Sequence, residues 1–142
     1  MIRSSLAFIL LFAFASVPAW AAQNVTTHKV FSGSKTMTGQ VFSYPADGEA
    51  HVTSMRLEFG PGGDVGWHKH LAPSYIYVIE GTLTIEFAEG KQQNIEQGTG
   101  FLPTLDVWHN GRNIGSGPLT ALLVINGVKG KRGIVFRNDT SP

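Results

Sequence analysis

The chain contains no cysteine among its 142 residues, and this absence limits both its fold and its chemistry. Because no disulfide can form, stability must come from a hydrophobic core or from association with other subunits. A thiol nucleophile and a cysteine-ligated zinc site are excluded as well. Any bound metal ion must therefore take its ligands from histidine, carboxylate, tyrosine or water.

Charged residues are scarce and nearly balanced, with 11 Lys and Arg against 10 Asp and Glu. Lys129, Lys131 and Arg132 lie close together in the sequence, and a solvated turn explains them. Proteins that bind nucleic acid through phosphate contacts present many basic residues on one surface. We therefore expect no nucleic-acid partner.

A helical pattern is also missing, because no segment beyond residue 22 keeps a helical spacing of apolar residues for about three turns. Short runs of β-type residues alternate instead with turn sequences such as Gly60-Pro61-Gly62-Gly63. Within these runs, alternate residues such as Met55 and Leu57 share one face. The predicted strands are Val25–Phe31, Gly39–Tyr44, His51–Phe59, Tyr75–Glu80, Thr82–Ala88, Gln92–Glu96, Gly100–Pro103, Leu119–Asn126 and Ile134–Arg137. Many short strands at this spacing predict an all-β sandwich or barrel.

The longest apolar run opens the chain. Arg3 precedes an apolar core of about 12 residues, and Ala19-Trp20-Ala21 places small residues where a signal peptidase cuts. A membrane span needs roughly 20 apolar residues, so the run is too short for an anchor. We interpret residues 1–21 as a cleaved signal peptide, with cleavage after Ala22 as the alternative. This predicts a periplasmic or secreted protein with one domain, residues 22–142, and no membrane span after cleavage.

The segment Tyr75 to Ile79 is apolar on both faces, which predicts that both faces are covered. The barrel interior can cover one face. A second sheet or a partner subunit can cover the other, so we expect a homodimer as one arrangement.

Three of the five histidines stand in a recognisable pattern. His68 and His70 are two residues apart, so in an extended segment both side chains point to the same face. His109 follows 39 residues after His70, and we expect it at the end of a later strand. Imidazole suits Zn, Fe, Ni and Cu, so three converging rings would make a chemically sensible metal site.

The surroundings of His68 and His70 resemble the first short motif of the cupin family. That motif runs Gly, five residues, His-x-His, three or four residues, Glu, six residues, Gly. In this chain the corresponding positions are Gly62, His68, His70, Ser74 and Gly81. The family's following strand, commonly Tyr-Val-Leu-Glu-Gly, is matched by the sequence of residues 77–81.

The surroundings of His109 resemble the second cupin motif, in which Gly98, His109 and Asn113 keep their spacing. Thr104 and Asp106 replace a proline and a glycine of that motif. The resemblance implies a single-domain cupin double-stranded β-helix, the all-β jelly-roll barrel. It also implies one divalent metal ion, whether Fe, Zn, Ni, Cu or Mn, bound by the histidines 68, 70 and 109.

One departure from the family concerns the glutamate ligand, whose position is taken by Ser74. A serine hydroxyl is a poor ligand for a divalent ion, so three alternatives follow. The three histidines suffice, as in some cupin-like dioxygenases that use iron; or Tyr75, Tyr77 or Glu80 replaces the carboxylate; or the metal has been lost. By strand parity, Tyr75 and Tyr77 should face away from Ser74.

Other residues near the motifs have a structural and a functional interpretation. Trp67, Trp108 and Phe101 either line an apolar pocket beside the metal or pack in the barrel wall. His51 either enters the barrel as a group behind the ligands or lies in solvent at the start of its strand. Asp106 either contacts a ligand imidazole or stabilises a turn, and the turn is the simpler explanation.

The cupin fold hosts many activities, so fold alone determines no reaction. The first hypothesis is an exported metalloenzyme, with iron-dependent dioxygenase chemistry as its leading form and a small organic molecule as substrate. The absence of a strong acid or base near the motifs favours chemistry carried out by metal and O₂. The alternatives are a non-catalytic module that binds a small molecule or metal, and a metal-free structural cupin.

Overall fold

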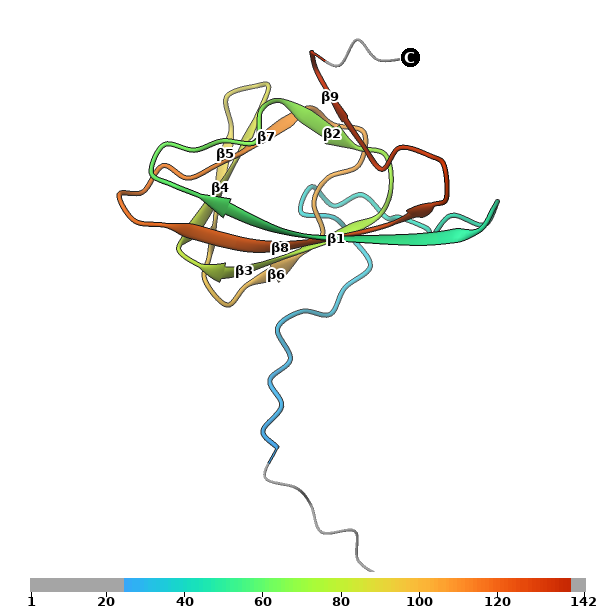
Figure 1. Cartoon of the computed structure of the whole chain (residues 1–142), viewed down its shortest axis with the longest axis horizontal. Coiled ribbons are helices and arrows are strands. Elements are labelled where there is room, and N and C mark those ends of the chain that lie inside the picture. The colour runs from blue at the N-terminus through green and yellow to red at the C-terminus, as the bar shows by residue number, and fades with distance from the viewer. Residues whose placement is uncertain (1–24, 139–142) are drawn as a thin grey trace, which may run out of the picture.

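The computed structural model describes residues 25–138 and contains two antiparallel sheets that face each other (Figure 1). The predicted signal peptide lies outside the described residues. Within residues 25–138 no helix is present that could cross a membrane. The strands are β1 (Ala50–Phe59), β2 (His68–His70), β3 (Ser74–Glu80), β4 (Thr82–Phe87), β5 (Gln92–Glu96), β6 (Gly100–Phe101), β7 (His109–Arg112), β8 (Leu119–Val128) and β9 (Ile134–Phe136).

The first sheet has the strand order β1-β8-β3-β6, and the second has the order β5-β4-β7-β2-β9. Neighbouring strands are often distant in sequence, as β8 lies between β1 and β3. This arrangement leaves β1 at the edge of the first sheet and β9 at the edge of the second. The predicted all-β jelly-roll architecture is therefore confirmed.

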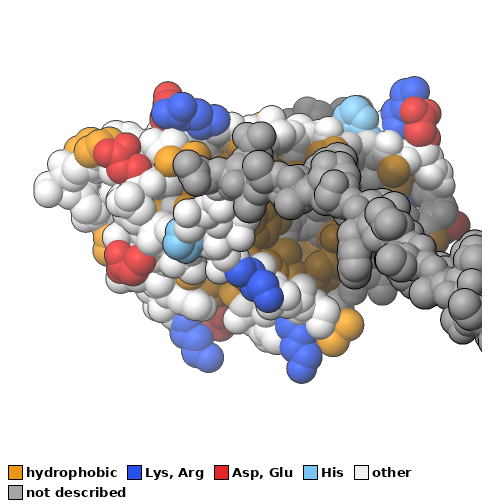
Figure 2. Space-filling model, turned by 90° about the horizontal axis from the view of Figure 1, so that it is seen from below, with side chains coloured by type: hydrophobic (Ala, Val, Ile, Leu, Met, Phe, Trp, Pro, Cys, Tyr) orange, Lys and Arg blue, Asp and Glu red, His pale blue; other side chains and the backbone are white. Residues whose placement is uncertain are grey.

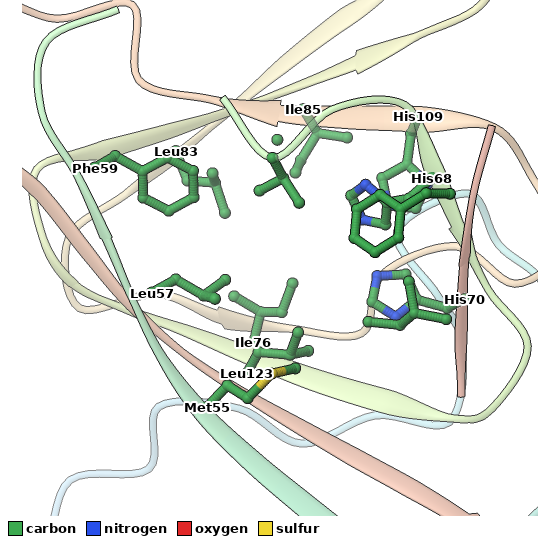
Figure 3. Close-up of a pocket in the computed structure, with 14 residues that line it drawn as sticks. Met55, Leu57, Phe59, His68, His70, Ile76, Leu83, Ile85, His109 and Leu123 are labelled. Carbon is green, nitrogen blue, oxygen red and sulfur yellow. The ribbon is translucent and has the colours of Figure 1, made fainter. Parts of the chain in front are cut away.

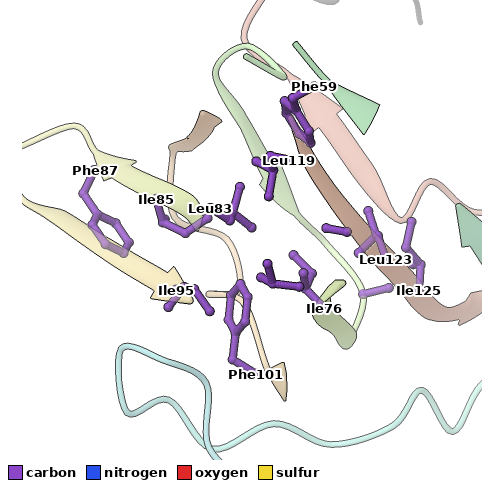
Figure 4. Packing of buried hydrophobic residues seen from close by; sticks show 13 residues of the cluster. Phe59, Ile76, Leu83, Ile85, Phe87, Ile95, Phe101, Leu119, Leu123 and Ile125 are labelled. Atoms are coloured by element: carbon purple, nitrogen blue, oxygen red, sulfur yellow. The ribbon is translucent and has the colours of Figure 1, made fainter. Parts of the chain in front are cut away.

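The hydrophobic core lies between the two sheets and follows the strand alternation (Figure 4). Leu83, Ile85 and Phe87 point inward from β4, as their spacing of two predicts. They meet β8 residues such as Leu119 and Leu123 from the opposite sheet. Burial of these apolar side chains is the main favourable contribution to the stability of a fold without disulfides.

Most predicted strands match the structure to within two residues at each end. The predictions for 25–31 and 39–44 are wrong, because this region forms no strand and only the isolated bridge between Lys35 and Val41. Val25 and Val41 are largely exposed there. β-propensity describes how a side chain fits a half-buried pleated surface, and without a neighbouring strand it does not produce one.

The N-terminal segment does cover part of the outer face of β3. The ring of Phe31 lies 5.8 Å from that of Tyr75. Figure 2 views the molecule from below and shows hydrophobic side chains in a hollow near the centre of this side, with charged side chains around its rim. Part of the cover expected over Tyr75–Ile79 thus comes from the chain itself, while Ile79 stays exposed. The homodimer remains a prediction.

Candidate metal centre

The three patterned histidines come together at one end of the space between the sheets (Figure 3). His68 and His70 lie on β2, while His109 opens β7 rather than ending a strand as predicted. The antiparallel pairing of β2 with β7 places His68 directly opposite His109. One nitrogen from each of the three rings lies within 4.8 Å of the others, and all three residues are buried. The grouping expected from the His-x-His spacing is therefore present.

Each of these imidazoles is oriented by a hydrogen bond at its Nδ1 atom. His68 Nδ1 lies 2.8 Å from the carbonyl oxygen of Gly66, and His109 Nδ1 lies 2.9 Å from that of Val107. A carbonyl oxygen can only accept, so both Nδ1 atoms carry the proton. His70 Nδ1 lies 3.1 Å from Ser74 Oγ. In the neutral rings of His68 and His109, Nε2 is therefore left with a free lone pair.

Ser74 completes the same arrangement for His70. Its hydroxyl donates to the carbonyl oxygen of Ala72 at 2.9 Å, so its oxygen is free to accept from His70 Nδ1. The side chain that takes the place of the family's glutamate thus contacts a ligand ring rather than the ligand position. At the position of the family's glutamate, Ser74 thus donates its hydroxyl hydrogen to Ala72 and turns its oxygen toward His70 Nδ1.

The free nitrogen of His70 gives the clearest test of whether the residues fit a metal ion. His70 Nε2 is buried and has no hydrogen-bond partner within residues 25–138. An unpaired buried polar atom costs about 1–3 kcal/mol relative to a paired one. A divalent ion bound by the three Nε2 atoms would supply the missing partner, so the donor set fits a metal.

Burial holds all three rings in their neutral form. It lowers the pKa of His70 to about 3, with the neighbouring His109 and His68 adding to the effect. Burial likewise lowers the pKa of His109 to about 4, against the raising effect of its bond to Val107. The pKa of His68 is lowered for the same reason. Neutral imidazole is the form that binds metal, so near pH 7 no proton has to be displaced.

These shifts predict how the metal-free protein responds to acid. In the unfolded state the histidines have a pKa near 6.5. Below that pH the unfolded state therefore binds protons that the folded state does not bind. The contribution of the histidines to the free energy of unfolding is therefore fully present above about pH 6.5. It is lost as the pH falls toward the pKa values of the histidines in the folded protein. Between pH 7 and pH 5 we expect a loss of about 2 kcal/mol for each of His70 and His109. Urea unfolding after chelation measures it, and a His70→Gln variant that keeps the full loss would contradict this account.

None of the three side chains that could replace the family's glutamate ligand, Tyr75, Tyr77 and Glu80, lines the cavity beside the histidines. Tyr75 and Tyr77 alternate with the inward residues of β3 and lie on its outer face, as strand parity predicts. Glu80 is exposed at the end of β3. The metal-ligating side chains that converge within the described residues are the three histidines. The geometry therefore favours the three-histidine arrangement.

The three rings form one end of a cavity of about 130 Å³. Phe59 and Leu83 lie toward its other end (Figure 3). Among the described residues that line it, no side chain other than the imidazoles carries a polar atom. The lining residues are Met55, Leu57, Phe59, Val65, His68, His70, Ile76, Leu83, Ile85, His109, Gly111, Leu123, Ile134 and Phe136.

Three further predicted pocket residues do not line this cavity. Trp108 lies just before β7, and Lys69 and Arg137 lie over its ring at 5.4 and 5.8 Å from the centroid. Phe101 is buried in the core instead. His51 is exposed near the start of β1 and borders a separate surface pocket with Tyr44. None of the three lines this cavity. Trp108 directly precedes the inward-pointing His109, so its side chain is expected on the other side.

Asp106 has the turn role that its residue type predicts. Its φ of 54° lies in the left-handed region, where the family motif has glycine and where Asp is tolerated. The backbone N–H of Asp106 donates to the carbonyl oxygen of His70 at 2.9 Å, and its carboxylate pairs with Lys69. The turn thus holds the strand that carries His68 and His70.

Sequence reasoning missed a residue that anchors this turn. Gln40 Oε1 accepts hydrogen bonds from the backbone N–H of Leu105 at 2.9 Å and from Thr104 Oγ1 at 2.8 Å. Its Nε2 donates to the carbonyl oxygen of Leu105 at 2.9 Å. Leu105 forms a bridge with His70, so Gln40 supports β2 through Leu105. An isolated glutamine in an N-terminal segment gives no sequence signal for this role.

Comparison with known proteins supports the motif assignment. The family model Cupin_2, described as a cupin domain, matches residues 55–125, which is half of the chain and includes all three histidines. None of the curated proteins matches the chain.

Solved structures share the fold at low identity. A cupin domain from Bordetella pertussis Tohama I is 24% identical with a TM-score of 0.50, over 61% of this chain and 91% of that one. The DMSP lyase DddQ from Ruegeria pomeroyi DSS-3 is 14% identical with a TM-score of 0.52, over 64% and 45%. An oxalate decarboxylase from Lactobacillus farciminis is 22% identical with a TM-score of 0.52, over 64% and 29%. The chain thus spans most of the first but less than half of the two enzymes.

Proposed function

The chain belongs to the cupin domain family, and on this basis we propose that it works through one divalent metal ion bound by His68, His70 and His109. The observation that carries the proposal is the buried, unpartnered Nε2 of His70, next to two rings whose Nδ1 protons are already bound to carbonyl oxygens. Three nitrogen lone pairs therefore converge at one end of an otherwise apolar cavity, and a metal ion is the partner that they fit.

The ligand type narrows the choice of ion. Imidazole ligands suit Fe, Zn, Ni and Cu, whereas Mn is better served by carboxylates. Three neutral rings also leave the full charge of the ion uncompensated by the protein. Such an ion acts as a Lewis acid toward a bound oxygen atom, and an iron ion could in addition activate O₂.

We propose oxygen-dependent oxidation of a small organic molecule as the leading activity. The described cavity lining offers no carboxylate, hydroxyl or lysine for proton transfer, and the three imidazoles are committed to the metal. The chain's own contribution is then to hold the ligand rings, to orient the substrate against apolar walls and to exclude water. Water exclusion favours reactive oxygen chemistry by preventing side reactions.

The two enzymes among the structural relatives support the fold rather than a shared reaction. The oxalate decarboxylase is 22% identical to this chain, which covers 29% of its length, so the match shows the fold alone. We therefore do not extend oxalate decarboxylation to this chain. A non-catalytic binding module is the second candidate, favoured by the small size of the chain and by Ser74 in place of the family's glutamate ligand. It would hold its ligand without turnover.

We also propose that the protein is exported. The sequence of residues 1–21 has the order of a signal peptide, which would place the metal centre in the periplasm or outside the cell. The proposal does not depend on the compartment, because the three histidines all lie within the barrel.

Replacing Ser74 with alanine tests the metal proposal at a residue that is not a ligand. Ser74 orients His70 through Nδ1, so Ser74→Ala is expected to weaken Zn²⁺ binding about tenfold or more while the barrel stays folded. Competition with a chromogenic chelator measures the affinity.

The matched control is Ser54→Ala, because Ser54 is exposed on β1. Its affinity for Zn²⁺ should equal that of the unchanged protein. Equal affinity in the Ser74→Ala protein as well would mean that His70 is not a ligand positioned by Ser74, and the proposed site would be wrong.

A further inference from the structure

The exposure of the cavity's lining residues locates its mouth. Residues deep in the sheets, such as Leu83 and Ile85, are almost fully buried. Met55 and Leu57 on β1 are half-buried, and on β9 Ile134 is half-buried and Phe136 is 44% exposed. Because β1 and β9 are the edge strands of the two sheets, the mouth lies between these edges.

Phe136 stands at this mouth beside the metal ligands. Its ring centroid lies 5.6 Å from that of His68, and β9 pairs with β2 in the register His68 to Phe136. A molecule that enters between β1 and β9 must therefore pass an apolar rim before it reaches the imidazoles. A polar or charged solute would lose its hydration there without gaining a partner.

The size of the cavity sets the size of its occupant. An apolar cavity of about 150 Å³ lined by Leu, Ile and Phe stays dry and binds benzene. The cavity here is about 130 Å³ and has the same kind of apolar lining everywhere except at the end formed by the three histidines. It therefore accommodates about six heavy atoms of an apolar body.

From this geometry we propose that the cavity takes a neutral, apolar molecule about the size of benzene, which enters between β1 and β9. The donor atom of such a molecule would point to the three histidines, and this last step rests on the proposed metal function. The apolar body is recognised by the walls alone. Recognition of the body is therefore expected in metal-free protein too.

The test uses the full chain after chelation, with benzene as the probe and oxalate as a charged comparison. Saturating benzene should raise Tm by roughly 5 °C, and oxalate should leave it unchanged. Intermolecular NMR contacts from benzene should reach the methyl groups of Leu83 and Ile85 and should be absent at the exposed Val52. No benzene effect, or contacts at exposed methyl groups only, would overturn the proposal.

Leu57→Phe fills the cavity from the β1 side and should remove most of the benzene shift. Val52→Phe makes a comparable change at an exposed position of the same strand and should keep it. If Leu57→Phe fails to fold, the NMR contacts in the unchanged protein still decide the matter. Metal uptake is measured separately by adding Zn²⁺ to the chelated protein. A protein that binds benzene but takes up no metal would support the cavity proposal and refute the metal function. A protein that takes up metal but does not bind benzene would do the reverse.

Discussion

Replacing His109 with alanine is expected to remove nearly all of the thermal stabilisation that Zn²⁺ gives to the protein. At a Zn²⁺ concentration a hundred times its Kd, the unchanged protein should gain about 2.7 kcal/mol, or roughly 10 °C in Tm. Loss of one of three ligands should weaken binding at least about a hundredfold. At the same Zn²⁺ concentration the variant should then gain only about 2 °C.

His51→Ala is the matched control for this experiment. His51 is an exposed histidine on β1 and does not line the cavity, so its replacement should leave the Zn²⁺-dependent shift intact. A full shift in the His109→Ala protein, or a lost shift in the His51→Ala protein, would place the metal elsewhere than at the three-histidine centre.

Replacing Gly81 with alanine is expected to be the most destabilising of these substitutions. Gly81 joins β3 to β4 with a φ of 78°, a conformation that costs other residues about 1–2 kcal/mol. A Cβ atom there would also lie 2.5 Å from the carbonyl oxygen of Pro118 and 3.1 Å from the Cα of Leu119. Since these are backbone atoms, the strand must move. We expect a total cost of about 3–4 kcal/mol in the free energy of urea unfolding.

Gly98→Ala separates the two causes of this loss. Gly98 has a similar φ of 81°, but a Cβ atom there would meet nothing within 4 Å. Its replacement should cost about 1–2 kcal/mol, from the backbone conformation alone. Equal losses for the two variants would show that the approach of Pro118 to Gly81 is not the constraint that the structure describes.

The sequence predicted those parts of the fold in which local pattern and burial agree. The alternation of Met55, Leu57 and Phe59 placed β1 correctly, because one face of that strand is turned inward. The runs of 25–31 and 39–44 have similar propensity but no neighbouring strand, and their prediction was wrong. The short strands β2 and β7 were missed, because three or four residues are too few for a period to show.

The grouping of the three histidines was predictable for a different reason. Strand parity places His68 and His70 on one face, and the resemblance to the cupin motifs adds His109. The orienting bonds were not predictable, because Gly66 and Val107 act through backbone carbonyl oxygens that any residue would provide. The role of Ser74 depends on the path of the chain between β2 and β3, which brings its hydroxyl to Nδ1 of His70.

The lining of the cavity could not be predicted from the sequence either. For Trp108 and Phe101 the sequence left a pocket role and a packing role open. In the structure Phe101 lies in the core, and Lys69 lies over the ring of Trp108 outside the cavity. The mouth of the cavity lies between β1 and β9. Residues 60–133 separate these two strands in the sequence, and only the two-sheet topology brings them together as edge strands.

Elemental analysis of the protein purified without a histidine tag tests the central claim most directly. The same analysis of a folded His68→Ala/His109→Ala variant serves as the control. The account predicts close to one equivalent of iron, zinc, nickel or copper in the unchanged protein and none in the variant. Absence of metal from both proteins, even after anaerobic incubation with each ion, would contradict a metal-dependent function.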